Sequence, residues 1–191
     1  ARVGLFDKPD DLLGAESALL HVRPLGFTDF IASAGTAQWG QVKKDTDFSA
    51  PATKLQFARF YTSGNIGLDA GSPLGIEWRH SYMRSIRANL TSGAKTVLLT
   101  RPSGNSYLFK DVGSGEWHAE SDVRYVLEAV REDGALVSWH VHAPDQTIEE
   151  FDAAGNLQKI DYPDGDFITF RYSEGKVSVA TDANGRSLAF S

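Results

Sequence analysis

Two histidines separated by one residue are the first feature of the sequence that could do chemistry. His140 and His142 flank Val141 in a run that alternates apolar and polar residues. Residues two apart on a β-strand point to the same face and lie ~7 Å apart, and some zinc sites take two of their ligands from such a pair. A third ligand would have to come from His118, His80 or a carboxylate, and their spacing in the sequence does not show which of them lies near this pair. We therefore predict two solvent-facing histidines and no metal site.

The carboxylates offer a second chemistry. Glu77 beside Trp78, or Asp152 with Asp161, could be the acid and base of a glycoside hydrolase, which needs carboxyl groups ~5 to 9 Å apart. For Asp152 we favour a different role, in which the carboxylate accepts hydrogen bonds from the backbone amides of its own turn. The chain has no cysteine and no nucleophile elbow. We expect no catalytic centre and no cofactor, with a metal- or carboxylate-dependent hydrolase as the weakest alternative.

Composition narrows the classes of partner. The 191 residues carry a net charge of −6, and the chain has no basic stripe that would release counterions from phosphates, so we expect no nucleic acid partner. No apolar run approaches the ~20 residues of a membrane helix, so we expect no membrane insertion. The sequence starts with Ala1 and lacks the pattern of a signal peptide. We expect any targeting information to lie outside it.

The elements that position these residues follow a repeat near the end of the chain. Glycines recur every ten residues, at Gly155, Gly165, Gly175 and Gly185, each after polar residues typical of tight turns. The runs between them alternate like strands with one buried face, as in Ile168 to Tyr172, and in Val177 and Val179 around Ser178. The predicted unit is one strand plus one turn, and such a unit must be covered by its neighbour.

The stretch from Phe151 to Gly165 resembles the tyrosine-aspartate (YD) repeat of the Rhs and YD-repeat family, with Phe in the place of Tyr. The resemblance gives these positions a structural role in the repeat motif: Phe151, Asp152, Gly155, Asp161, Pro163, Gly165, Tyr172, Gly175 and Gly185. Two upstream stretches, 45–64 and 74–86, resemble the domain that opens the Rhs repeat region, through Phe60, Tyr61, Gly75, Trp78, His80 and Tyr82. Ile76 and Glu77 stand where that domain has x-Gly before Trp. The resemblance covers residues 36–191.

The resemblance implies a function. In that family, long arrays of such strands form a hollow β-shell that encloses a toxin or effector cargo for delivery between cells. This chain would be an opening, non-catalytic segment of such a shell, secreted or at a bacterial cell surface, with further repeats of the parent chain and the cargo as its partners. A cell-surface carbohydrate-binding module is the alternative, and it would need Trp78, Trp117 or Trp139 exposed as sugar-stacking platforms.

The sequence as a whole predicts an all-β fold, an antiparallel meander of about ten to twelve short strands. Residues 1–35 would form a helical or irregular cap, 36–145 the opening β domain, and 146–191 the repeats. Hairpin strands are expected at 97–100 and 106–109, and residues 122–131, which also suit a helix, are assigned to a strand. The last strand, 187–191, would leave Leu188 and Phe190 facing water unless residues 1–35 cover them or two copies meet edge to edge in a homodimer.

Overall fold

The computed structural model describes residues 42–62, 74–75, 77–91, 94–113 and 115–190, and these residues form only strands and turns. Of the two units into which the chain divides, 1–30 and 31–191, all described residues belong to the second. The predicted cap at 1–35 lies outside them. The part described contains no helix long and apolar enough to span a membrane.

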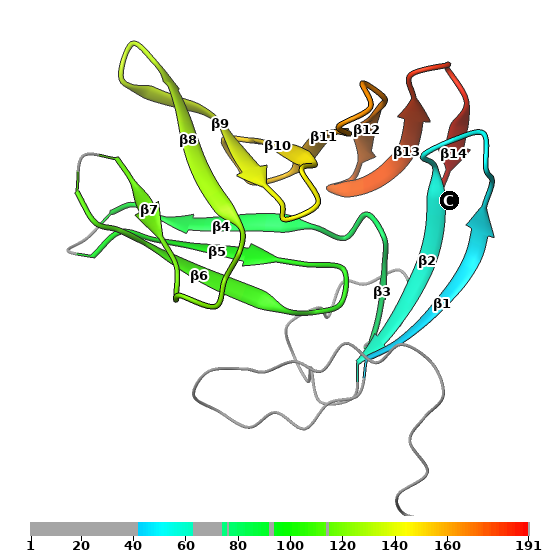
Figure 1. The fold of residues 1–191 in the computed structure, drawn as a ribbon, viewed down its shortest axis with the longest axis horizontal. Helices are drawn as coiled ribbons and strands as arrows, with labels where there is room; N and C mark the ends of the chain where they lie inside the picture. The colour runs from blue at the N-terminus through cyan, green and yellow to red at the C-terminus, as the bar shows by residue number, and fades with distance from the viewer. Residues whose placement is uncertain (1–41, 63–73, 76, 92–93, 114, 191) are drawn as a thin grey trace, which may run out of the picture. The chain divides into compact units, whose positions relative to one another are not determined.

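A small antiparallel sheet opens the described chain. It consists of β1 (Val42–Ser49), β2 (Gln56–Thr62) and β3 (Trp78–His80), in that order. The β1–β2 hairpin lies beside β13 and β14 (Figure 1), where Thr53 Oγ1 donates a hydrogen bond of 2.6 Å to Asp182 Oδ2.

The second sheet has eleven antiparallel strands in sequence order, so each strand pairs only with its neighbours in sequence and the edge strands have one partner each (Figure 1). They are β4 (Ser85–Asn89), β5 (Thr96–Thr100), β6 (Ser106–Asp111), β7 (Trp117–His118), β8 (Val126–Glu132), β9 (Ala135–His142), β10 (Ile148–Asp152), β11 (Leu157–Asp161), β12 (Phe167–Ser173), β13 (Lys176–Asp182) and β14 (Ser187–Ala189). This sheet runs without a break across residues 145 and 146. The predicted all-β antiparallel meander is confirmed.

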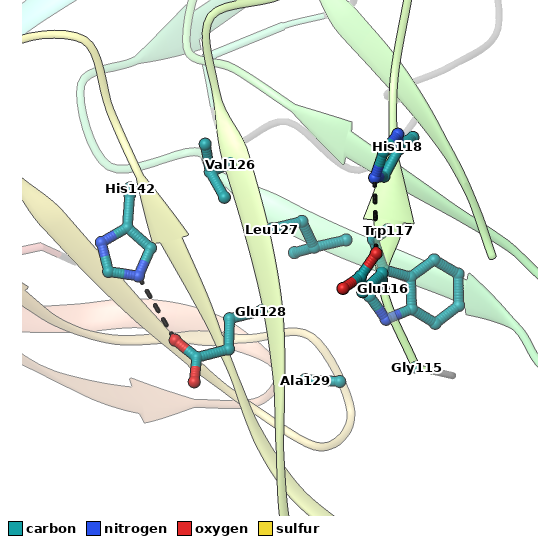
Figure 2. A pocket seen from close by; sticks show the side chains of 9 residues that line it. All are labelled: Gly115, Glu116, Trp117, His118, Val126, Leu127, Glu128, Ala129 and His142. Atoms are coloured by element: carbon teal, nitrogen blue, oxygen red, sulfur yellow. Dashed lines mark hydrogen bonds and ion pairs between the residues drawn. The ribbon is translucent and has the colours of Figure 1, made fainter. Parts of the chain in front are cut away.

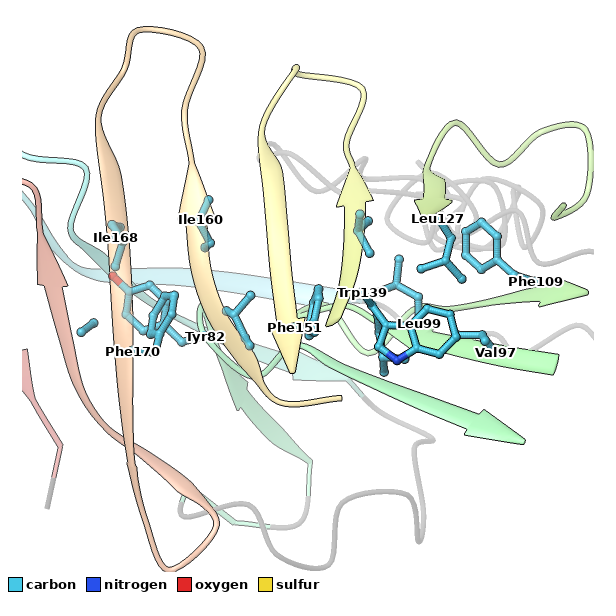
Figure 3. Close-up of a cluster of buried hydrophobic side chains, with 14 of the residues drawn as sticks. Tyr82, Val97, Leu99, Phe109, Leu127, Trp139, Phe151, Ile160, Ile168 and Phe170 are labelled. Carbon is cyan, nitrogen blue, oxygen red and sulfur yellow. The ribbon is translucent and has the colours of Figure 1, made fainter. Parts of the chain in front are cut away.

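One face of this sheet carries the core, because apolar side chains alternate with polar ones along most of its strands. Figure 3 shows the cluster, in which the following side chains are at most 1% exposed: Val97, Leu99, Phe109, Trp139, Val141, Phe151, Leu157, Ile160, Ile168 and Ala180. Burying a large apolar side chain contributes ~1.5 to 3 kcal/mol. The core therefore holds the strands of the opening region and of the glycine repeat together.

In the middle of the chain, the observed strands lie close to where the sequence predicted them. The expected hairpin is β5–β6, with Thr100 opposite Ser106. The ambiguous stretch 122–131 is a strand, although it starts only at Val126 and continues to Glu132. The β8–β9 hairpin turns at Asp133 and Gly134, both at positive φ (50° and 82°), which is the backbone of a type I′ turn.

The alternation of side chains between the two faces of the sheet is interrupted at two β-bulges. In β9 the register shifts opposite Val130 and Arg131, so Val137 does not share the face of Trp139 and Val141 and is 42% exposed. In β13 Val177 packs against the core, but Val179 pairs with exposed Arg171. The prediction that Val177 and Val179 share one buried face was wrong, and the alternation around His140 and His142 does not extend back to Val137, because each bulge inserts a residue and reverses the facing of the residues beyond it.

Candidate functional site

The four repeat glycines all sit in turns between consecutive strands. Their φ angles are 90°, 88°, 75° and 80° for Gly155, Gly165, Gly175 and Gly185, a backbone region that disfavours residues with a side chain. In three of the turns the glycine N–H donates to the carbonyl oxygen three residues earlier, at 2.9 to 3.0 Å. The predicted ten-residue turn period is confirmed.

The repeat aspartates cap their own turns. Asp152 Oδ1 accepts a hydrogen bond of 2.8 Å from the backbone N–H of Asn156. Asp182 Oδ1 accepts from the backbone N–H groups of Asn184 and Arg186, at 3.0 and 2.9 Å. This is the role that the sequence favoured for Asp152. Asp161, the other member of the proposed hydrolase pair, forms an ion pair of 2.7 Å with Lys159.

Gly155 differs from the other three glycines, because it is buried and touches β4. Its carbonyl oxygen accepts a hydrogen bond of 3.0 Å from the Ile86 N–H, and Asn156 forms an isolated bridge with Ser85. A Cβ atom on Gly155 would lie 1.9 Å from the Ile86 carbonyl oxygen, whereas one on Gly165, Gly175 or Gly185 would meet open space. The first repeat turn is therefore seated directly on the backbone of the opening region.

A buried ion cluster fixes the same junction. Glu149 of β10 is fully buried and accepts hydrogen bonds from Arg84 and from Arg101, whose Nη2 lies 2.8 Å from Glu149 Oε1. Burial alone would raise the pKa of the Glu149 carboxyl, but the two guanidinium groups outweigh it and hold that pKa below its usual range. The Arg101 guanidinium also stacks 4.8 Å from the ring centre of Tyr125. The cluster joins the β3–β4 and β5–β6 connections to β10.

The sequence contained a signal for this cluster that our prediction missed. Glu149 stands two residues before Phe151, which is buried, so strand alternation puts its carboxylate on the core face. A carboxylate there must find cationic partners. Nothing in the sequence identified Arg84 and Arg101 as those partners.

Aromatic residues in the small sheet and just after it pack against Phe190, which directly follows the last strand. The Phe190 ring lies 5.5 Å from Phe57, 5.8 Å from His80 and 5.9 Å from Tyr82, between ring centres. His80 is 7% exposed, and burial together with the charge of Arg79 lowers its pKa to about 4. Among the described residues, the cover of Phe190 is thus the chain's own small sheet, which the sequence did not suggest.

The residues of the opening-domain motif do not form one group. His80 and Tyr82 belong to the Phe190 cluster, and burial raises the pKa of Tyr82 to about 12. Tyr61 and Trp78 form a separate ring pair 5.3 Å apart. The backbone N–H of Trp78 donates a hydrogen bond to the carbonyl oxygen of Gly75. Phe60 pairs with Arg79 across β2 and β3. The motif residues are therefore spread over the small sheet and its junction.

The remaining repeat-motif residues are also structural. Phe151 is buried in the core, and the Tyr172 hydroxyl donates a hydrogen bond of 2.9 Å to the Leu157 carbonyl oxygen. Burial raises the pKa of Tyr172 to about 12. Pro163 is exposed in the β11–β12 turn beside Asp164, which forms an ion pair with Lys54.

The histidines do not converge. His142 lies 3.4 Å from Glu128 and His118 lies 3.9 Å from Glu116, while His140 sits opposite Glu128 on β8 and Glu150 on β10. These two histidine–glutamate pairs line a shallow groove between β7 and β8 (Figure 2). Within the described ranges no three His, Asp or Glu side chains are placed to hold a metal ion.

The comparison with protein families gives one match. Residues 40–109 match a family described as Domain of unknown function (DUF6531). This segment runs from the start of the small sheet to β6, and it contains Arg84, Ile86 and Arg101. No curated protein matches the chain. The matched segment thus supplies the partners on which Glu149 and Gly155 dock.

Proposed function

We propose that the chain is a non-catalytic structural segment of an Rhs or YD-repeat β-shell, in which a domain at 40–109 starts a wall of repeated strands. One observation carries the proposal. Every strand of the eleven-stranded sheet pairs only with its neighbours in sequence, and the repeat at its end adds one strand per ten-residue turn period. Such an arrangement can be lengthened by further units without changing those already present.

The docking contacts support a starting role for the opening region. The first repeat turn rests on Ile86, the buried Glu149 is held by Arg84 and Arg101, and the β1–β2 turn contacts the β13–β14 turn through Thr53 and Asp182. Repeated strands with one apolar face need such a cover at the place where the array begins.

The contacts of the buried and turn carboxylates also agree with a structural role. The aspartates of the repeat are engaged in their turns, and Glu149 is neutralised by two arginines. The carbohydrate-binding alternative has less support, because Trp117 and Trp139 are only 6% and 0% exposed, and the partly exposed Trp78 ring already packs against Tyr61 and Arg59. We infer that the wall would enclose a cargo, a toxin or effector, and act outside the cell or at its surface.

Proteolysis of the parent protein tests enclosure. We expect a cargo segment that follows the repeats to resist protease in the intact parent and to be cut rapidly when it is expressed by itself. Gly155→Ala, which breaks the docked turn, should restore cleavage, and Gly165→Ala, in an open turn, is the matched control. Equal cleavage of the cargo in the intact parent and alone would contradict enclosure.

A further inference from the structure

A groove between β7 and β8 is a feature of the described surface that the proposed function does not use. Its volume is about 460 Å³, and Figure 2 shows its two walls. Glu116, Trp117 and His118 come from the β7 side, while Val126 and Glu128 come from β8. Leu127 lies between the walls, opposite Trp117 in the sheet register.

The groove borders an open strand edge. β7 has two residues and pairs with β8 only at Trp117 and Leu127, whereas β8 continues to Glu132 and is paired with β9 along its whole length. On the side away from β9, residues 129–132 therefore have no strand partner in the part of the chain described. Unpaired backbone N–H and C=O groups on such an edge accept an added strand.

The walls of the groove are acidic. Glu116 and Glu128 line it from the β7 and β8 sides with side chains 71% and 59% exposed, and Glu132 and Asp133 extend the same charge along the open edge. Val126, which is 60% exposed, lies on the β8 wall and gives the groove an apolar patch. The basic groups nearby are His118 and His142, which lie 3.9 Å and 3.4 Å from these glutamates, and Arg131, which donates a hydrogen bond to the carbonyl oxygen of Gly134. Long cationic side chains suit this surface, because their stems can cover Val126 while their charges reach the carboxylates.

Trp117 adds an unsatisfied donor at the groove. Its side chain is 6% exposed and lines the groove, yet its indole Nε1–H has no hydrogen-bond partner in the described structure. Buried polar groups are nearly always hydrogen-bonded, and a buried donor without an acceptor is destabilising. A carbonyl oxygen brought into the groove would supply that acceptor.

We propose that this groove binds an extended segment of a protein partner that carries lysine or arginine at alternate positions and joins the open edge of β8 as an additional strand. Strand addition satisfies the backbone of 129–132, and the two-residue period of the incoming strand puts every second side chain over Glu116 and Glu128. The inference uses only the geometry of β7 and β8 and does not rest on the proposed shell function.

The probe for this site is an acetylated and amidated seven-residue peptide that alternates Thr and Lys. Titrated into the ¹⁵N-labelled chain, it should shift the amide signals of 129–132 and the indole N–H signal of Trp117, in a saturable manner. The double variant Glu116→Lys with Glu128→Lys should weaken binding by at least about tenfold, because it places like charges at the contact. Glu174→Lys, in the exposed β12–β13 turn, makes one such charge change far from the groove and should leave the affinity unchanged.

Two further peptides separate strand addition from simple charge attraction. A version N-methylated at alternate residues keeps the lysines but cannot form the backbone ladder, so it should lose binding. A version with Glu in place of Lys should not bind. The proposal is overturned if the Thr–Lys peptide does not bind, if the N-methylated peptide binds equally well, or if the shifted signals lie away from 129–132. Both groove glutamates are exposed, so a thermal melt can verify that the double variant remains folded.

Discussion

Among single residues, Gly155 combines two requirements that the other turn glycines do not share. Its φ of 90° favours glycine, and its buried position leaves no room for a Cβ atom beside the Ile86 carbonyl group. The sequence revealed the first requirement through the ten-residue period. It could not reveal the second, because all four glycines look alike in sequence and only the tertiary contact with β4 distinguishes Gly155.

Alanine substitution should separate these two effects. Gly165→Ala and Gly185→Ala should each lower the free energy of unfolding by about 1 kcal/mol, from the positive φ alone. Gly155→Ala should cost about 3 kcal/mol or more, because the backbone of Ile86 must also move. Urea unfolding of the three variants measures the difference, and equal losses in all three would show that the contact with Ile86 is not formed.

The Glu149 cluster gives a second residue-scale prediction. Glu149→Gln should destabilise the chain by about 3 to 5 kcal/mol, because it leaves two guanidinium groups without their buried counter-charge. The neighbouring Glu150→Gln, on the opposite and partly exposed face of β10, serves as the control and should change stability by less than about 0.5 kcal/mol. Unfolding curves compared at neutral pH test this, and a small effect at Glu149 would argue against a buried cluster.

His80 makes stability depend on pH. Its pKa is about 4 in the folded chain, against 6.5 for a histidine side chain free in water, so between these pH values the unfolded chain binds a proton that the folded chain does not. The free energy of unfolding should therefore fall by up to about 3 kcal/mol as the pH drops from 6.5 to 4. The lowered pKa of Glu149 removes further stability as the pH falls below about 4.5, because the unfolded chain then takes up a proton that the folded carboxylate does not. His80→Gln should flatten the decline, and an unchanged slope in this variant would mean that His80 is accessible to water.

At the scale of elements, the positions of the strands were easier to predict than the face of the sheet on which each side chain lies. The period-two runs and the Asn, Asp and Gly turns specified where strands begin and end, as in β5–β6 and in the repeat. The facing of Val179 was mispredicted, because a bulge depends on how two strands share their hydrogen bonds. Long-range partners such as Arg84 for Glu149, or Phe57 for Phe190, were likewise not available from local spacing.

The contact between the small sheet and the last strand is testable at this scale. Phe190→Ala should cost about 3 kcal/mol and should raise amide hydrogen exchange in β2 and β14 together, since Phe190 contacts Phe57, His80 and Tyr82. Phe48→Ala, at an exposed aromatic of β1, is the matched control. Faster exchange in β14 alone would show that the two sheets are not coupled through Phe190.

For the molecule as a whole, the central claim is that the eleven-stranded sheet is part of a wall that continues beyond β14. The strands add in sequence order, the segment 40–109 holds the first repeat turn, and β14 has a strand partner only in β13 among the described residues. The sequence indicated the order of the described repeat strands through the regular turn period, because each added strand depends on local alternation and on its immediate neighbours.

The amides of β14 test this claim most directly. The Phe190 N–H donates to Ser178 of β13, so alternation directs the N–H groups of Ser187 and Ala189 away from β13, while that of Leu188 faces it. Hydrogen exchange should be measured in this chain and in the same chain lengthened by the next forty or so residues of its parent, about four further periods. We predict that Ser187 and Ala189 gain protection in the longer chain while Leu188 changes little. Unchanged, rapid exchange at Ser187 and Ala189 in the longer chain would contradict a continuing wall.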